Sequence, residues 1–463
     1  MKLNRKSTMQ GRAWTITLGL TAVGMMAGHA RAQTYPRAAW VADMPTGSHM
    51  SAGLARIVDE RTIQVDHFTY DGGAPAVYFY LGERDTYASF LNGIPIGSQL
   101  DRAYYDETVV VSLPVGETID GYGAIAVWCA DVKVKFTSAD FQCPGDLIRD
   151  GTVGLADLAQ LLGYYGTASG ARYDEGDLDG DGDVDLSDLA ALLALYGMPC
   201  NPRLNMAFDG LGDLGSDFVY EGWFIVDGSP VSTGRFSIDE SGVPFPAWFV
   251  VNYDDAANAT AFVLTIEPAV GDDPAPSQTH VLGGAWDGQS AALTVSHPAA
   301  LGDDFTSAAG EYILATPSTA SDPNDYDQGI WWLDPAAGPG PSLTLPTLPV
   351  GWSYEGWVVG SGGPITTGKF LSAAGADSDG PGPAAGPDPA PPFPGQDFIS
   401  PPEVLIGYAA VITIEPDPDN SPSPFSLKPL VDMSVDDVGG DVLQSMANNA
   451  ASLATGTVML AMY

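Results

Sequence analysis

Hydrophobic residues between positions 38 and 141 follow the two-residue period of a β-strand. Apolar and polar residues alternate, or apolar residues run together, over four stretches that Gly, Asp and Pro separate. The stretches are 63–68, 76–81, 108–113 and 124–134. This pattern predicts a β-sandwich or a small β-barrel for the first folded region.

A helical period appears further along the chain, twice, with identical spacing. Apolar side chains recur at i, i+3, i+4 and i+7, and a glycine follows each set as a helix stop. The sets are Leu158, Leu161, Leu162 and Tyr165 before Gly166, and Leu189, Leu192, Leu193 and Tyr196 before Gly197. We expect two short amphipathic helices that bury these stripes against each other.

An acidic loop precedes the second of these helices. In residues 177–188, acidic side chains stand at loop positions 1, 3, 5, 9 and 12, and Gly182 at position 6 permits a sharp turn. So many like charges would repel one another without a cation, so we predict a calcium site, with a solvated acidic turn as the alternative. The predicted ligands are Asp177, Asp179, Asp181, the carbonyl of Asp183, Asp185 and Asp188.

A weaker form of this loop precedes the first helix. Position 3 holds Ile148, which cannot donate an oxygen. Because calcium affinity follows the number and charge of the ligands, we expect this loop to bind calcium less tightly or only to pack. Its predicted ligands are Asp146, Asp150, the carbonyl of Thr152 and Asp157.

The duplicated loop and helix resemble a known family. Residues 143–200 are similar to a dockerin, the paired calcium-loop-helix module of secreted polysaccharide-degrading systems. The resemblance implies a cohesin-like protein partner. Dockerins carry polar, partner-selecting residues at loop positions 10 and 11, whereas this chain has Leu155-Ala156 and Leu186-Ser187 there. The partner is therefore left open, and a cell-surface protein is the alternative.

Two of the three cysteines, Cys143 and Cys200, stand at the two ends of this module. Their placement predicts a disulfide that closes the module, and two free thiols are the alternative. A loop of this length would contribute about 4 kcal/mol by the chain-entropy estimate.

Charge and the N-terminus indicate where the protein acts. Basic residues precede an apolar run over 13–26, and Ala30-Arg31-Ala32 follows as a cleavage site, so we predict a signal peptide over 1–32, with an uncleaved anchor as the alternative. The chain has 18 Lys and Arg against 58 Asp and Glu, a net charge of −40, which excludes nucleic acid as a partner. No later stretch predicts a membrane span. We expect a secreted or cell-surface protein.

Several segments of the first region resemble the DM13 family of exported and cell-surface proteins. They are 49–53, 65–72, 75–82, 113–114 and 127–129. The family is proposed to transfer electrons through a cysteine, which corresponds here to Cys129. A buried, unreactive thiol is the alternative, as is pairing with another chain or a cofactor. His49 and His67 are candidate neighbours of this thiol.

The remainder of the chain contains a repeat. Residues 220–236 match 354–370 at an offset of 134, and 263–268 match 411–416 at an offset of 148. The longer offset reflects an insertion at 380–402, rich in Pro, Gly and Ala, which we expect to be a loop with little core. The repeats weakly resemble the extracytoplasmic β-domain of sigma-K-type anti-sigma factors, without the sigma-binding helices.

We therefore predict a mainly β, multi-domain protein. The predicted parts are 1–32 (signal peptide), 33–142 (DM13-like β-sandwich or barrel), 143–200 (small α, dockerin-like module), 201–345 and 346–463 (two β-sandwich-like units). Glu267 and Glu415 hold equivalent repeat positions and are expected to accept local hydrogen bonds rather than form a catalytic pair. Trp331 and Trp332 are candidates for stacking on a glycan, with core packing as the alternative.

Three functions compete. The favoured one is a non-catalytic binding or assembly protein with a calcium-stabilised module. The second is electron transfer through Cys129. The third is a polysaccharide-degrading enzyme or accessory, which only the dockerin resemblance suggests. No catalytic motif stands in the sequence, so we do not expect an enzyme.

Overall fold

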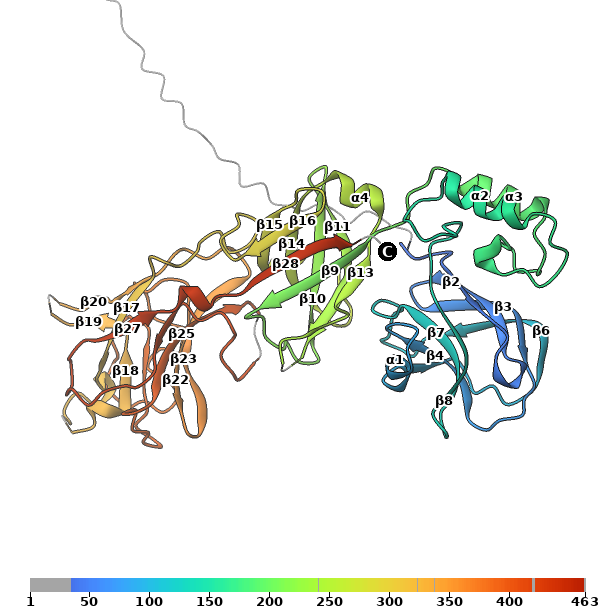
Figure 1. Ribbon diagram of the computed structural model, residues 1–463. Coiled ribbons are helices and arrows are strands. Elements are labelled where there is room, and N and C mark those ends of the chain that lie inside the picture. Colours follow the sequence, from blue (N-terminus) through green and yellow to red (C-terminus); the bar gives the residue numbers. More distant parts are fainter. Residues whose placement is uncertain (1–34, 240, 323, 337, 419–420, 462–463) are drawn as a thin grey trace, which may run out of the picture.

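The computed structural model describes residues 35–463 except 240, 323, 337, 419–420 and 462–463. The predicted signal peptide lies outside the described residues. The chain is mainly β, as predicted, and forms two lobes (Figure 1): residues 35–200 in one and residues 201–461 in a longer one. Within the described ranges, no helix has both the length and the apolar character needed to cross a bilayer.

Two antiparallel four-stranded sheets form the first β-domain. The first has the order β1 (Val41–Met44), β2 (Ala52–Asp59), β3 (Thr62–Tyr70) and β6 (Tyr104–Ser112). The second has the order β5 (Ile94–Ile96), β4 (Val77–Gly82), β7 (Ala124–Cys129) and β8 (Val134–Asp140), with α1 (Tyr87–Leu91) beside β4. The stretch predicted as one strand over 124–134 is instead a hairpin. Its turn lies at 130–133, where Lys133 has a positive φ.

The small α-module contains α2 (Leu155–Tyr164) and α3 (Leu186–Leu195). Leu161 and Leu192 are completely buried, as the stripe predicts. Leu158 and Leu189 are partly buried against the same core, but Leu162 and Leu193 depart from the prediction, because they are 52% and 53% exposed. The helices therefore bury a narrower stripe than a mutually packed pair would need.

The module is closed and anchored at its base. The predicted disulfide between Cys143 and Cys200 is present. Val41 and Leu54 of the β-domain belong to the module's own hydrophobic core. Arg172 of the module also lies 3.3 Å from the Asp43 carboxylate. The module therefore packs directly on the edge of the first sheet.

A nine-stranded sheet forms the part of the long lobe nearer to the β-domain. Its order is β12 (Pro244–Phe245), β11 (Ser229–Ile238), β10 (Phe218–Val226), β14 (Ala259–Pro268), β15 (His280–Ala285), β16 (Ser290–Thr294), β28 (Thr455–Ala461), β9 (Arg203–Asp209) and β13 (Trp248–Val250). α4 (Tyr253–Asn258) precedes β14. A Cβ on Gly234 of β11 would lie 2.3 Å from the Phe249 ring of β13, so the two ends of the sheet approach each other as in a nearly closed barrel.

A second nine-stranded sheet forms the far end of the lobe. Its order is β23 (Gly363–Phe370), β22 (Trp352–Gly360), β25 (Ala409–Pro416), β26 (Leu430–Asp432), β27 (Gln444–Asn448), β17 (Ala309–Leu314), β18 (Gly329–Trp331) and β24 (Gly395–Asp397), with β21 (Leu343–Thr344) on β17. A short ribbon of β19 (Leu333–Asp334) and β20 (Gly340–Pro341) lies beside it.

The two sheets do not follow the predicted division at residue 345. Strands β17 and β18 precede that position but belong to the second sheet, and the last strand, β28, returns to the first. β28 pairs with both β16 and β9, which is visible as the red strand within the green and yellow sheet (Figure 1). The returning strand ties the two repeats into one lobe.

The sequence repeat is a structural repeat. β10 pairs with β11 as Tyr220 with Phe236, and β22 pairs with β23 as Tyr354 with Phe370. The Nε1 of Trp223 donates to Thr265 in the first copy. Trp357 donates in the same way to Thr413 in the second copy.

One expectation about the second copy is wrong, whereas core packing, the alternative given for Trp331 and Trp332, is confirmed. The insertion at 380–402 is not only a loop, because it supplies β24, whose Asp397 is buried and accepts a hydrogen bond from Trp331. Trp331 and Trp332 have no exposed surface, so neither can stack on a glycan. The indole ring of Trp332 fills the space that faces Gly356, which explains its burial.

Glu221 of β10 is a buried acid, and its burial raises its pKa. The side chain is 5% exposed, accepts a hydrogen bond from Ser232 and lies 3.4 Å from Arg235. Burial raises the pKa of Glu221 to about 7 against the lowering effects of Ser232 and Arg235.

This shift predicts a pH-dependent stability. The pKa of Glu221 is about 7 in the folded protein, against an ordinary value of 4.5. Between these two pH values the folded state keeps the carboxyl protonated, whereas the unfolded state does not. The stabilisation from this proton is fully present below pH 4.5 and is lost as the pH rises to about 7. The free energy of unfolding changes by about 3 kcal/mol over this range. Replacing Glu221 by Gln should keep the neutral form at every pH. We expect the melting temperature of Glu221→Gln to gain on that of the wild type between pH 5 and pH 8, whereas the exposed control Glu60→Gln should not. Parallel pH profiles for all three proteins would contradict the shift.

Candidate functional site

The second acidic loop brings carboxylates from both ends of the loop together. Oxygen atoms of Asp177, Asp179 and Asp188 lie within 4.8 Å of one another, as do those of Asp183, Asp185 and Asp188. Asp188 therefore belongs to both groups. Asp181 belongs to neither, and its carboxylate accepts the amide of Asp183 instead. The structure thus brings together four of the five predicted carboxylates and adds the side chain of Asp183, of which only the carbonyl was a predicted ligand.

Backbone amides hold these carboxylates in place. The two oxygens of Asp177 accept the amides of Gly180 and Gly182, at 2.8 and 2.9 Å. The two oxygens of Asp188 accept the amides of Leu178 and Asp185, both at 2.8 Å. Gly182 has a φ of +90°, the left-handed conformation that the sharp turn requires. The loop is therefore preorganised around its acids.

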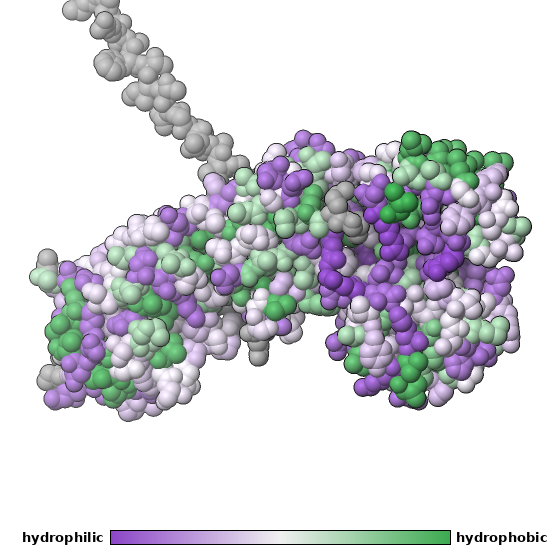
Figure 2. Space-filling model, viewed as in Figure 1, coloured by the Kyte–Doolittle hydropathy of each residue, from purple (hydrophilic) through white to green (hydrophobic). Residues whose placement is uncertain are grey.

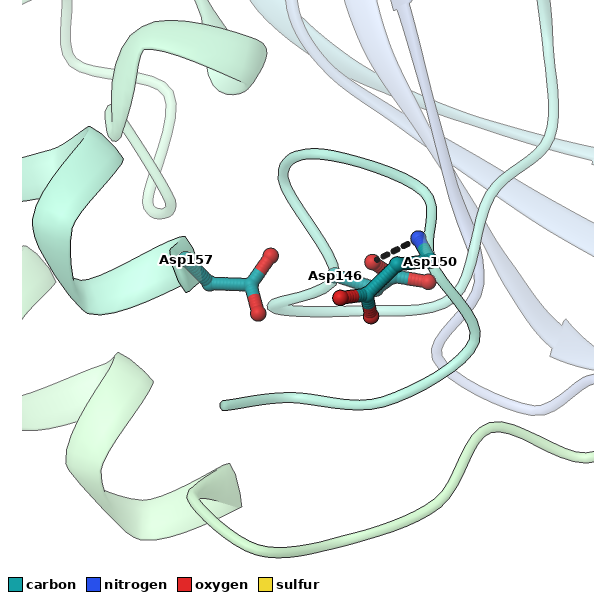
Figure 3. Close-up of side chains that lie close together, drawn as sticks. All are labelled: Asp146, Asp150 and Asp157. Carbon is teal, nitrogen blue, oxygen red and sulfur yellow. Dashed lines mark hydrogen bonds between the residues drawn. The ribbon is translucent and has the colours of Figure 1, made fainter. Parts of the chain in front are cut away.

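The first acidic loop repeats this arrangement despite Ile148. Oxygen atoms of Asp146, Asp150 and Asp157 lie within 4.8 Å of one another (Figure 3). The Asp150 amide donates to Asp146, as the dashed line in Figure 3 marks, and the Leu147 amide donates to Asp157 at 2.7 Å. Both loops therefore share the hydrogen bonds from the amides at positions 2, 6 and 9. They differ in the second amide that donates to position 1, which is at position 5 in the first loop and at position 4 in the second.

Burial of like charges leaves the loops electrostatically strained. Burial, with help from neighbouring Asp188 and Asp179, raises the pKa of Asp177 to about 6. Burial likewise raises the pKa of Asp146 and Asp179. Oδ1 of Asp183 is buried and has no hydrogen-bond partner within the described part of the chain. Oxygen-only donors, carboxylate charge and a buried free oxygen together fit a hard divalent cation such as calcium.

The second loop lies against the first β-domain. A Cβ on Gly180 would stand 2.9 Å from Leu54 and 3.5 Å from the His67 ring. The carboxylate of Asp43 also accepts the amide of Tyr173, just before the loop. No sequence signal identifies these contacts, because they join residues more than a hundred positions apart.

Apolar side chains cover the outer face of the two helices in matched pairs. Figure 2 shows this face as a green area over α2 and α3. The exposed pairs, each separated by 31 residues, are Leu155 with Leu186, Leu162 with Leu193, and Tyr165 with Tyr196. We call these six residues the paired apolar face. Contiguous exposed apolar patches of this kind mark interaction sites.

Cys129 ends β7 inside the first β-domain. The thiol is 1% exposed, and its Sγ donates to the carbonyl of Pro75 at 3.0 Å. Ile125 and Val127 share its hydrophobic core, as the alternation predicts. Tyr70 and Phe136 belong to the same core, and sequence reasoning did not identify them as neighbours.

The two candidate histidines take different positions. The ring of His49 lies 4.7 Å from that of Phe136 and 6.3 Å from that of Tyr70, and its Nδ1 is 3.1 Å from Asp71. His49 thus stands at the outer end of an aromatic group that reaches the core of Cys129. His67 pairs with Asp106 at 2.7 Å and faces the second acidic loop instead.

Comparison with known proteins identifies one part of the chain. Residues 43–141 match the family model described as "Electron transfer DM13". Two proteins from Drosophila melanogaster, Skeletor isoforms B/C and Skeletor isoforms D/E, are each 31% identical over 145 residues, or 30% of this chain. The match covers 18% and 10% of their own lengths, so this chain spans less than a fifth of either. No solved structure matches. Residues 43–141 are therefore a DM13 domain.

Proposed function

We propose that this chain is an exported, non-catalytic binding protein whose module at 143–200 binds calcium and docks a protein partner. The observation that carries the proposal is the paired apolar face, whose six side chains are 46% to 72% exposed. A dockerin-like role explains this exposure, because the face is then buried in the complex. The partner that this role implies has a cohesin-like fold.

Calcium would make that face rigid. The two acidic loops lead directly into α2 and α3, so Asp157 and Asp188 each fix the first turn of a helix to a loop. A bound cation neutralises the carboxylate groups that burial forces together. The second loop has the larger set of acids and would bind more tightly than the first.

A catalytic role in polysaccharide degradation receives no support from the repeats. Glu267 accepts the amide of Ser277, and Glu415 accepts the amide of Phe425, both at 2.9 Å. These are the local hydrogen bonds expected of strand-end glutamates.

Docking predicts a calcium-dependent complex. We expect immobilised cohesin domains to retain the full-length protein in calcium and to release it in chelator. Leu162→Ser/Leu193→Ser should weaken the complex about a hundredfold, because the two side chains would lose about 2 to 3 kcal/mol of buried contact. Leu91→Ser, at a comparably exposed leucine of the DM13 domain, is the matched control and should bind as the wild type does. Failure of a broad cohesin panel to retain the wild type, or equal binding by the double variant, would contradict this role.

A second function, electron transfer through Cys129, is favoured by the DM13 match. The aromatic group of Tyr70, Phe136 and His49 connects the core around the thiol with the surface at Asp71. In such a step an oxidised redox protein docked near Asp71 would take one electron from the thiol through the aromatic rings, leaving a thiyl radical and releasing the thiol proton to water.

Voltammetry separates this function from simple core packing. We expect a reversible signal in the wild type that disappears in Cys129→Ser and persists in Cys143→Ser/Cys200→Ser, since Cys129 is not part of that disulfide. Thermal melts should show that Cys129→Ser stays folded. A voltammogram that Cys129→Ser leaves unchanged would assign the thiol to packing alone.

A further inference from the structure

A cavity of about 500 Å³ lies where the DM13 domain, the α-module and the first nine-stranded sheet meet. Trp40 and Phe141 line it from the first part, Cys143 from the second and Trp248 from the third. Ligand sites occur preferentially at such junctions. The cavity is separate from the acidic loop at 177–188, from the paired apolar face and from Cys129, but Asp146 and Arg149 of the first acidic loop line one part of it.

The cavity concentrates positive charge in a strongly acidic protein. Nine arginines follow residue 32, and four of them line this one cavity: Arg37, Arg84, Arg149 and Arg203. They come from positions far apart in the sequence, so no local motif accounts for their meeting. Guanidinium groups are the side chains best suited to bind a carboxylate, because their paired donors match its two oxygens.

Arg37 is the buried arginine among the four that line the cavity. It is 1% exposed, and its guanidinium lies 5.4 Å from the Trp40 ring and 5.5 Å from the Trp248 ring. Nη1 donates to the carbonyl of Ile119 at 2.9 Å, and the guanidinium also interacts with Tyr35 and Asp120, but Nε and Nη2 have no hydrogen-bond partner that meets standard geometry among the described residues. Arg203 stacks on Trp248 at 4.0 Å. Buried donors without acceptors are costly unless a ligand or water satisfies them.

Acidic and amide side chains that also line the cavity limit the class of ligand that it can bind. Glu83, Asp140 and Asn205 line the cavity, as does Asp146, whose two oxygens already accept the amides of Asp150 and Gly151. The carboxylates of Glu83 and Asp140 can accept hydrogen bonds from hydroxyl groups of a ligand. The indole and phenyl rings supply flat apolar surface for a ring with nonpolar faces. A ligand that uses all three features has a carboxylate, several hydroxyls and a compact ring.

We propose that this cavity binds an acidic saccharide, a sugar ring or pair of rings that carries a carboxylate. The arginines hold the carboxylate, the acidic and amide side chains accept the hydroxyls, and the aromatic rings contact the ring face. The volume accommodates one or two sugar rings. The site is built only when the DM13 domain, the module and the first sheet are assembled together.

Calorimetric titration of the full-length protein tests the site. The probes are digalacturonate, the neutral disaccharide cellobiose, and sodium sulfate. We expect digalacturonate to bind at least tenfold more tightly than either of the others. Arg84→Gln/Arg149→Gln removes two exposed arginines of the cavity and should weaken digalacturonate binding at least tenfold. Arg61→Gln/Arg102→Gln, at two arginines outside the cavity, is the matched control and should leave it unchanged.

Each result decides the proposal. Melting temperatures equal to that of the wild type would show that the variants are folded. Absence of digalacturonate binding to the wild type would overturn the site. Equal binding by Arg84→Gln/Arg149→Gln would overturn its location. Sulfate or cellobiose binding as tightly as digalacturonate would overturn the acidic-saccharide ligand.

Discussion

Repulsion between carboxylates is the constraint on which the centre of this protein depends. Two short loops each gather acids from both ends into a space of a few ångströms and bury part of their charge. Backbone amides compensate this charge only in part, because the pKa of Asp177 still rises to about 6. In the proposed calcium-bound state the cation supplies the missing positive charge, and both helices begin from a fixed point.

That fixed point connects the other parts of the chain. The module shares its core with strands β1 and β2 of the DM13 domain, and its disulfide closes it next to the start of the long lobe. The paired apolar face then points away from the DM13 domain, over the outer side of α2 and α3 (Figure 2). A rigid module would thus present its face and hold the cavity at the three-way junction together.

The sequence predicts local features of this structure well and long-range ones poorly. The strand periods, the helix pair, the Cys143–Cys200 bridge and the structural repeat all follow from residues close in sequence or from matched spacing. The return of β28 to the first sheet does not, because its pairing with β9 and β16 joins segments more than 150 residues apart. The burial of Trp331 is also a long-range effect, since Trp331 pairs with β24, which lies in an insertion that the sequence predicts to be a loop.

The candidate sites divide in the same way. The carboxylates of the acidic loops could be identified from spacing alone. Spacing does not predict that Asp181 stays outside both groups, because its carboxylate accepts the backbone amide of Asp183 instead. The four arginines of the junction cavity carry no sequence signal, because separate domains supply them.

Hydrogen exchange measured by mass spectrometry, with the full-length protein in calcium and in chelator, tests the central claim most directly. If a captured cation holds the acidic loops together, removal of calcium should speed exchange in 177–195 and in the adjoining strand β2, and Asp179→Ala should exchange rapidly in both conditions. Exchange in the far sheet, around β22 and β25, should stay unchanged. Equal protection of 177–195 with and without calcium would contradict the account.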